Sequence, residues 1–411
     1  MEAGKKRGIA VNTLYTIGGA LVLNGVLQLL VYPRLAAELG AEANGAVLYI
    51  MAFVNILGPS IGQALNNSRL VVRRDMAVSN GDYDILILLM TALGIAGTFA
   101  IGGSTIAGSG IAVSIGPVPV FVLAAVLILL TNFRYYGDVE YRLSLNYRHY
   151  FIYYCLCGAG YAAGYFLYRL SGNWFWIFLL GEAAALFFVW WKGSIFKHFF
   201  RRSEFFGIAA RRGSLLVLSY FVTNLTLNYD RLYLKSAISG EAVTQYYVVS
   251  LIGKTLVLFI APINTILISS LTKDNVRLSR RRFLSYTAAG CAAAAVFFLL
   301  CQIGTPLFVR LFYPSLYESV KGLVTVVNLT QILAMLSAYL FIVVLTFTGA
   351  HYQLLLQCLH LAAVLILTHL PGIHGSLTGF SNSILIANAL RIAAVIILGV
   401  IFAGQGDKPH E

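Results

Sequence analysis

The amino-acid sequence predicts an all-α polytopic membrane protein, with about twelve transmembrane helices in two six-helix bundles. Charged residues make up 11% of the chain and apolar residues 59%, whereas soluble domains carry roughly 25% and 45–50%. Apolar runs repeatedly reach the roughly 20 residues that a helix needs to cross about 30 Å of hydrocarbon. Along the chain, loops rich in Lys and Arg also alternate with loops that hold few of them, as is typical of membrane proteins. These observations leave no room for a sizeable soluble domain.

The apolar runs define the individual spans. Each run is bounded by short polar or basic segments, and the longest of these segments covers 192–212. The predicted spans lie near 11–32, 45–65, 85–107, 117–133, 150–168, 174–191, 213–233, 243–271, 284–304, 322–348, 352–370 and 379–402.

The distribution of basic residues predicts the orientation of these spans. Of the 29 Lys and Arg residues, twenty-one lie on the side that includes both termini and six on the other, while Lys254 and Arg391 lie within spans. Cytoplasmic loops carry the excess of Lys and Arg, so we expect both termini in the cytoplasm. The net charge of +13 is thereby explained by topology and does not indicate a nucleic-acid partner.

The basic segment 192–212 divides the chain into two halves of six spans each. We therefore predict an N-terminal bundle over 1–191, a cytoplasmic linker over 192–212 and a C-terminal bundle over 213–411. A faint parallel repeat supports this division, because similar residues follow the first and the seventh span. They are Arg34-Leu35, Gly40, Glu42-Ala43 and Pro59 in the first half, and Arg231-Leu232, Gly240, Glu241-Ala242 and Pro262 in the second. Repeats of this kind place a substrate site between the halves, near the midplane.

Three ionisable residues, Glu182, Lys254 and Arg391, lie near the centres of apolar runs. A charge in hydrocarbon costs from about 2.5 to over 10 kcal/mol, so such groups usually face a cavity or a partner. Glu182 is expected either to neutralise Lys254, Arg391 or another cation, or to couple transport to an ion. For Lys254 and Arg391, contact with a substrate phosphate competes with pairing to Glu182 and with local hydration. Arginine and lysine in such positions favour an anion.

Polar side chains gather in the first, second, seventh, eighth and twelfth spans. A single Asn in a span is typical of an interhelical hydrogen bond, but the set suggests the walls of a cavity. Asp230 and Arg231 lie near the outer end of the seventh span, and Asp230 is a second candidate for ion coupling. The asparagines predicted to line this cavity are Asn24, Asn55, Asn224, Asn228, Asn264 and Asn388.

Several function classes lack their sequence signatures. There is no Walker sequence, no HExxH, no zinc-spaced Cys/His set and no nucleophile elbow. We therefore expect no enzyme activity, no metal and no cofactor. The five cysteines all fall inside spans, where cysteine usually acts as a small hydrophobe. Gly160 and Gly164 form a GxxxG pair, which permits close approach of helices.

Several short motifs resemble the Wzx-type polysaccharide flippases of the MOP superfamily. The resemblance runs over most of the chain, although each motif is short and the spans from the third to the sixth add little. The motifs are Asn12-Thr13-Leu14-Tyr15, Arg34-Leu35 with Gly45, Asn228-Tyr229-Asp230-Arg231-Leu232-Tyr233-Leu234, Gly240-Glu241-Ala242-Val243, Tyr246-Tyr247, Gly253-Lys254, Pro262-Ile263-Asn264 and Pro306-Leu307-Phe308-Val309-Arg310-Leu311-Phe312-Tyr313.

This resemblance implies two six-helix bundles that alternate between inward and outward openings in a bacterial cytoplasmic membrane. The implied substrate is an oligosaccharide on undecaprenyl pyrophosphate, moved to the outer leaflet for surface polysaccharide synthesis. The implied partners are membrane lipid and the glycosyltransferases or polymerase that handle the same substrate. A cationic central cavity would be formed here by Lys254, Arg391, Arg34 and Arg231, and the asparagines predicted to line the cavity would face sugar hydroxyls.

Three other functions remain open. A MATE-like cation or drug antiporter belongs to the same superfamily, but it would favour acids at the midplane, where bases outnumber acids two to one. A lipid II flippase has similar chemistry but generally has fourteen spans. From a different class, a membrane-embedded glycosyltransferase or polysaccharide ligase would require a large outer loop with catalytic acids or histidines, and the loop 305–321 holds only Glu318.

Overall fold

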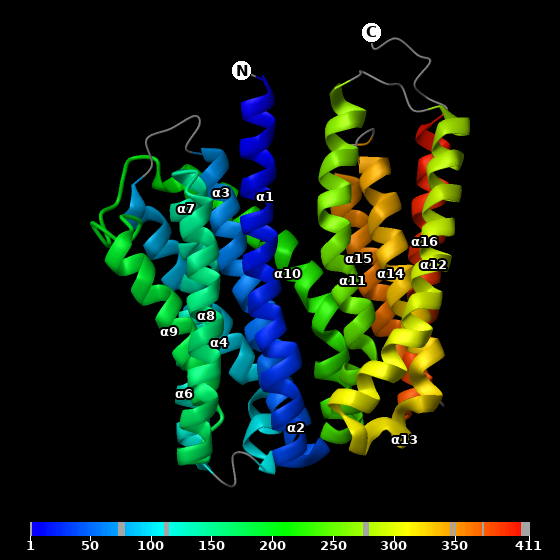
Figure 1. Cartoon of the computed structure of the whole chain (residues 1–411), viewed down its shortest axis with the longest axis horizontal. Coiled ribbons are helices and arrows are strands. Elements are labelled where there is room, and N and C mark those ends of the chain that lie inside the picture. Colours follow the sequence, from blue (N-terminus) through cyan, green and yellow to red (C-terminus); the bar gives the residue numbers. More distant parts are fainter. Residues whose placement is uncertain are drawn as a thin grey trace. The chain divides into compact units, whose positions relative to one another are not determined.

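The computed structural model confirms an all-α polytopic membrane protein (Figure 1). It describes residues 2–72, 79–110, 115–273, 279–345, 348, 351–371 and 374–403; side chains are described except those of 2–10, 72, 257–273, 345, 351 and 353. Contacts divide the chain into two compact units, unit 1 over Met1–Leu232 and unit 2 over Tyr233–Glu411. The boundary between the units falls inside one helix, and the linker predicted over 192–212 remains a prediction.

Unit 1 begins with helices that are broken rather than straight. The first is α1 (Glu2–Gly25), which continues through a π-helical segment, Val26–Val31, into α2 (Tyr32–Leu57). Gly40 has φ 77° and ψ 167°, a conformation that glycine adopts readily, and it breaks α2 between the first and second predicted spans. A second π-helical segment, Gly58–Gln63, leads into α3 (Ala64–Val72).

The rest of unit 1 consists of straighter helices. They are α4 (Asn80–Ala107), α6 (Pro117–Gly137), the short α7 (Val139–Leu143), α8 (Tyr147–Ser171) and α9 (Phe175–Lys192), followed by most of α10 (Phe206–Ala237). Hydrogen bonds attach α10 to this unit: Asn67 Nδ2 donates to the Tyr220 hydroxyl at 2.7 Å, and Asn224 Nδ2 donates to Ser60 Oγ at 3.2 Å.

Helices α8 and α9 approach each other closely because three glycines lie at their interface. A β-carbon on Gly160 would lie 2.7 Å from the Cα of Gly181, and one on Gly164 would lie 2.6 Å from the Cα of Ile177. A β-carbon on Gly181 would overlap the ring of Tyr161. This confirms the packing role predicted for Gly160 and Gly164.

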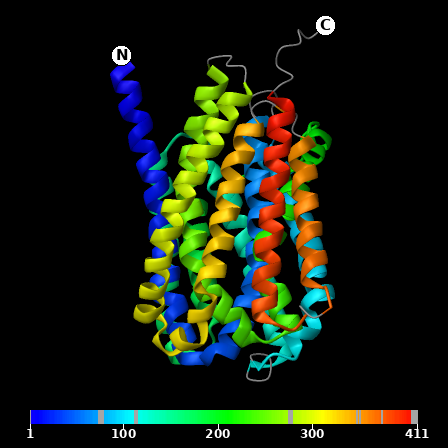
Figure 2. The same ribbon diagram turned by 90° about the vertical axis from the view of Figure 1, so that its right-hand side faces the viewer.

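Unit 2 contains the remaining helices, of which α12, α14, α15 and α16 run nearly parallel (Figure 2). Within unit 2, α16 packs against α12, α14 and α15, and α14 also packs against α11 and α12. The helices are α11 (Gly240–Lys273), α12 (Arg280–Phe312), α13 (Tyr317–Val320), α14 (Val324–Leu345), α15 (His351–Thr368) and α16 (Leu377–Phe402), with 3-10 turns at Pro314–Leu316 and Lys321–Leu323.

Seven of the described helical stretches are long and apolar enough to cross a membrane, one of them containing both the first and the second predicted span. The predicted spans near 150–168, 213–233, 243–271 and 352–370 are also helical, as α8, α10, α11 and α15. Large apolar side chains are exposed on several of these helices, for example Leu299, Leu300 and Ile303 on α12. Exposed apolar side chains are compatible with lipid contact, so the fold is that of a multi-pass membrane protein.

Candidate functional site

A buried ion pair occupies the interior of unit 1. Arg134 Nε on α6 lies 2.5 Å from Glu182 Oε2 on α9, and both side chains are about one-twentieth exposed, at 5% and 4%. The Tyr161 hydroxyl on α8 donates to Glu182 Oε1 at 2.6 Å. Three helices therefore meet at one carboxylate. A buried charge is tolerated when it is paired and hydrogen-bonded, which is the state of Glu182.

Arg134 is the partner of Glu182, although its position in the sequence suggested a loop. The apolar run of the fourth span ends at 133, but α6 continues to Gly137 and carries Arg134 inside the bundle. The guanidinium also lies 4.0 Å from the ring centroid of Tyr135, and the Tyr153 hydroxyl donates to the Arg134 carbonyl at 2.7 Å. The site thus contains a buried cation that the hydropathy pattern does not predict.

A second polar cluster joins α3, α8 and the junction of α6 with α7. Asp138 accepts hydrogen bonds from Asn66 Nδ2 and from the Tyr154 hydroxyl, the latter at 2.8 Å. Arg142 donates to the Oδ1 atoms of Asn66 and Asn67, both at 3.0 Å. Every member is hydrogen-bonded, so this network holds the helix ends together.

The predicted sugar-contacting asparagines of unit 1 form mostly local hydrogen bonds. Asn24 Nδ2 donates to the Ala20 carbonyl at 2.8 Å, and Asn228 Nδ2 donates to the Asn224 carbonyl at 3.0 Å. Asn224 Nδ2 donates to the Tyr220 carbonyl at 2.8 Å in addition to Ser60. Asn55 is partly buried in α2. The side chain of Asn264, on α11, lies outside the described side chains.

Arg34 lies where α2 begins, in a cluster of charged and aromatic residues. Its guanidinium is 5.4 Å from the ring centroid of Tyr165, whose hydroxyl donates to Glu38, and Glu38 pairs with Arg169 at 2.8 Å. Arg34 itself is exposed. It therefore belongs to a cluster of mixed charge in unit 1.

Asp230 and Arg231 lie on α10 in unit 1 and are both largely buried, at 7% and 9% exposure. Arg231 is close enough to Tyr32 on α2 for the two to interact electrostatically. The predicted cationic set therefore divides equally, with Arg34 and Arg231 in unit 1 and Lys254 and Arg391 in unit 2.

Lys254 and Arg391 lie near the same level of unit 2, on two helices that both contact α14. A β-carbon on Gly253 would overlap the Cβ of Gln331, so α11 touches α14 beside Lys254. Asn388 Nδ2 donates to the Thr330 carbonyl at 3.2 Å, so α16 touches α14 one turn before Arg391. Because the two contact points on α14 are consecutive residues, the two cations share a depth in the bundle.

Arg391 is the only charged residue of α16, and the three helices with the most extensive contacts to α16, namely α12, α14 and α15, carry no acid. The sequences of α12, α14 and α15 contain neither Asp nor Glu. Arg391 is partly buried, and His360 on α15 is near enough to interact with it electrostatically. The positive charge on α16 is thus uncompensated by an acid from these neighbours.

His360 is a member of this site that was not predicted from sequence. It is 7% exposed and lies within the largely apolar stretch 354–368. In the sequence, a histidine within an apolar stretch is only a weak indication of a functional site. The structure distinguishes His360 from an ordinary core residue by its proximity to Arg391. Asn388, which was predicted, is 3% exposed and lies on the same face of α16 as Arg391, three residues away.

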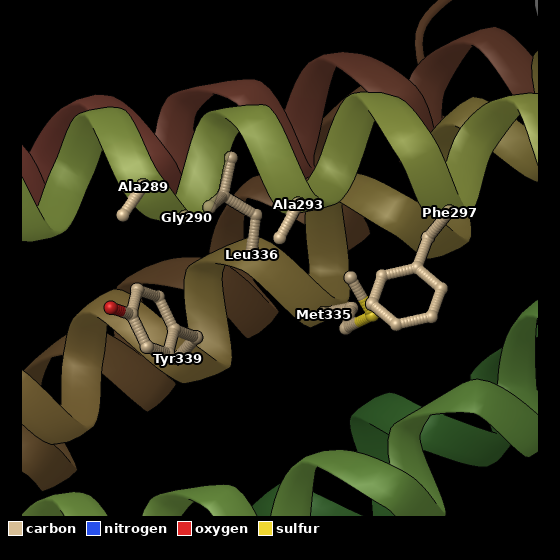
Figure 3. Close-up of a pocket in the computed structure, with 7 residues that line it drawn as sticks. All are labelled: Ala289, Gly290, Ala293, Phe297, Met335, Leu336 and Tyr339. Atoms are coloured by element: carbon tan, nitrogen blue, oxygen red, sulfur yellow. The ribbon is translucent and has the colours of Figure 1, made fainter.

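A small apolar pocket lies between α12 and α14 (Figure 3). Its volume is about 140 Å³, and it is lined by Ala289, Gly290, Ala293, Phe297, Met335, Leu336 and Tyr339. The Tyr339 hydroxyl donates to the Tyr286 carbonyl at 3.4 Å and is the polar group of the lining. The pocket can hold a few methylene-sized groups but offers nothing to a charged headgroup. Among the residues that the structure describes, no group of three or more His, Cys, Asp or Glu side chains could hold a metal.

Solved structures with a similar fold are MATE transporters. The chain aligns with an inward-facing multidrug resistance MATE transporter of the MOP superfamily at a TM-score of 0.64 and 16% identity, over 97% of this chain and 96% of the other. A MATE in the bent conformation aligns at 0.56 and 15%, over 98% and 96%, and an outward-facing MATE of the MOP superfamily at 0.54 and 16%, over 98% and 94%. No protein-family model and no curated protein sequence matches the chain. The chain therefore has the fold of the MATE transporters of the MOP superfamily.

Proposed function

We propose that this protein is a membrane transporter that moves an oligosaccharide linked to undecaprenyl pyrophosphate from the cytoplasmic to the outer leaflet. The observation that carries the proposal is the buried positive charge of Arg391 on α16, to which α12, α14 and α15 bring no acid. Lys254 on α11 lies near the same level of the bundle. Retaining a charge such as that of Arg391 in a membrane costs several kcal/mol unless an anion compensates it.

A diphosphate has the chemistry that these cations favour. Arginine binds phosphoryl oxygens with two parallel hydrogen bonds, while lysine acts as a mobile point charge. Asparagines among those predicted from the sequence would hydrogen-bond sugar hydroxyls, and the lipid tail would remain in apolar surroundings. With the cytoplasm negative, outward movement of each negative charge is favoured by about 2.3 kcal/mol per 100 mV.

Glu182 supports the same proposal because its carboxylate already has partners inside unit 1. Its carboxylate is held by Arg134 and Tyr161 inside unit 1. This pairing favours a structural role for Glu182 over ion coupling. Asp230 remains the other acid considered for coupling, on α10.

The second candidate function is a cation or drug antiporter, since two of the similar solved structures are multidrug resistance MATE transporters. A cationic cargo would be repelled by Lys254 and Arg391 in unit 2. The lipid-linked oligosaccharide is therefore the cargo we favour.

Deletion of the gene tests the choice between these functions. We expect the bacterial host to lose its surface polysaccharide and to accumulate the lipid-linked oligosaccharide at the cytoplasmic leaflet, with export restored by a plasmid copy. Surface staining and extraction of lipid-linked sugars measure both effects. Normal polysaccharide together with increased sensitivity to cationic drugs would instead identify the antiporter.

A further inference from the structure

The loop that joins α9 to α10 (Figure 1) contains six consecutive exposed side chains, at 197–202. They are Lys197, His198, Phe199, Phe200, Arg201 and Arg202. Phe200 is 61% exposed and Phe199 39%, and the two rings form an edge-on pair with centroids 4.7 Å apart. Exposed phenylalanines with cations on both sides are suited to the boundary between lipid headgroups and hydrocarbon.

The end of α9 leads into this loop with similar side chains. Helix α9 is long and apolar enough to cross a membrane, and Trp190 and Trp191 in its last turn are 70% and 64% exposed. Lys192 Nζ lies 4.0 Å from the ring centroid of Trp191. Tryptophan is enriched at the level of the headgroups. The 197–202 segment therefore follows closely on a part of the chain suited to the membrane interface.

The charge of the loop and its surroundings is strongly positive. Between 192 and 212 the sequence has six Lys or Arg residues and a single acid, Glu204. Of the nearby acids, Asp82 is buried, and Glu140 is partly buried and accepts a hydrogen bond from Ser194 at 3.3 Å. A surface of this charge attracts anions over about a Debye length.

Hydrogen bonds fix both ends of the segment to the start of α4. Asn80 Nδ2 donates to the Ser194 carbonyl at 2.9 Å before the segment. After it, the amide and the hydroxyl of Ser203 donate to the two carboxylate oxygens of Asp82, at 2.8 and 2.6 Å. A loop that is already ordered loses less conformational entropy when it binds a partner.

Two residues inside the segment have an unfavourable backbone conformation. His198 has φ 62° and Phe200 has φ 66°, in the left-handed region that bulky residues rarely adopt. Phe199 stacks on Phe133 of α6 with centroids 6.1 Å apart, so it helps to anchor the loop, while Phe200 is the more exposed ring. Backbone strain of this kind is found where a chain holds side chains for binding.

We propose that the 197–202 segment binds the phosphate headgroups of anionic membrane lipids in preference to zwitterionic lipids. Lys197, Arg201 and Arg202 would attract the headgroup, and Phe200 would enter the adjoining layer of acyl chains. An acidic protein would be attracted by the same charges, but the exposed aromatic groups that continue from a membrane span favour a lipid. The inference does not depend on which molecule is transported.

Quenching of tryptophan fluorescence by brominated lipids tests this binding. The full-length protein is reconstituted in mixtures of phosphatidylglycerol and phosphatidylcholine, with bromine near the headgroup end of the acyl chains of one lipid or the other. Trp190 and Trp191 report on lipids beside the segment, whereas Trp174 and Trp176 lie at the other end of α9. The difference between the wild type and the variant Trp190→Phe with Trp191→Phe isolates the first pair. At equal mole fractions we expect brominated phosphatidylglycerol to quench that pair at least twofold more strongly than brominated phosphatidylcholine.

A matched pair of triple variants separates the segment from the overall charge. Lys197→Gln with Arg201→Gln and Arg202→Gln should bring the ratio of the two quenching efficiencies close to one. These side chains are exposed, so the variant should remain folded. The control replaces three exposed cations at the start of α12 with glutamine, removes the same charge and should keep the preference. Its substitutions are Arg280→Gln, Arg281→Gln and Arg282→Gln.

Four outcomes would overturn the proposal. The first two are equal quenching by both lipids in the wild type, whether or not the segment binds a soluble acidic protein, and an unchanged preference after the three substitutions in 197–202. The third is an equal loss of preference in the control, which would reduce the effect to net charge. The fourth is displacement of brominated phosphatidylglycerol by a small mole fraction of undecaprenyl pyrophosphate, which would assign the segment to the cargo.

Discussion

Replacing Glu182 with glutamine is expected to destabilise the protein by about 3–5 kcal/mol, the cost of removing one partner from a buried ion pair. The substitution preserves the shape of the side chain but leaves Arg134 charged inside unit 1, at 5% side-chain exposure. Unit 1 contains no second acid bonded to Arg134 among its described side chains. Unfolding in detergent, followed by intrinsic fluorescence, measures the loss.

The matched control removes both charges together. The double variant Glu182→Gln with Arg134→Leu should recover much of the lost stability, because no uncompensated charge remains. Tyr161→Phe should cost less than Glu182→Gln, since it removes a single hydrogen bond of 2.6 Å to the carboxylate. Wild-type stability for Glu182→Gln would show that the ion pair contributes nothing to unit 1.

Lys254→Ala and Arg391→Ala are each expected to reduce export of surface polysaccharide at least tenfold while the protein stays in the membrane. Each substitution removes a partly buried cation of unit 2, to which a diphosphate would be attracted. A loss of about 1.4 kcal/mol in binding the transported state already corresponds to tenfold. Quantitative surface staining of complemented deletion cells measures export, and immunoblotting of membranes measures the protein.

Two further variants separate charge from shape. Lys254→Arg keeps the positive charge and should retain most of the export. Lys321→Ala removes an exposed cation of unit 2 that is paired with Glu318, and it should export normally. Wild-type export by Lys254→Ala and Arg391→Ala would contradict a role for these cations in holding the cargo.

The fold class was predictable from sequence because hydropathy and length depend on local composition. Among the residues that the structure describes, each of the twelve predicted apolar runs lies mainly in helix, and the break at Gly40 falls between the first and second runs. Helix ends were harder to predict, since α6 extends beyond its apolar run to include Arg134. Hydropathy places a residue like Arg134 in a loop, whereas its buried partner Glu182 allows it to remain inside the bundle.

Partnerships between distant residues could not be predicted from a single sequence. Glu182 and Arg134 are 48 positions apart, and their pairing depends on how α6 packs against α9. His360 illustrates the same limit, because its neighbour Arg391 comes from another helix. The roles of Lys254, Arg391, Arg34, Arg231 and the asparagines in binding substrate remain predictions.

Transport by the purified protein in proteoliposomes is the most direct measurement of the proposed cargo. Vesicles would carry a fluorescent undecaprenyl diphospho-oligosaccharide, a neutral lipid of equal chain length, or a cationic dye on one side. We predict that the wild-type protein accelerates translocation of the diphosphate lipid alone, and that Lys254→Ala and Arg391→Ala abolish the acceleration. Proton-driven or sodium-driven movement of the cationic dye, with no movement of the diphosphate lipid, would contradict the proposed function.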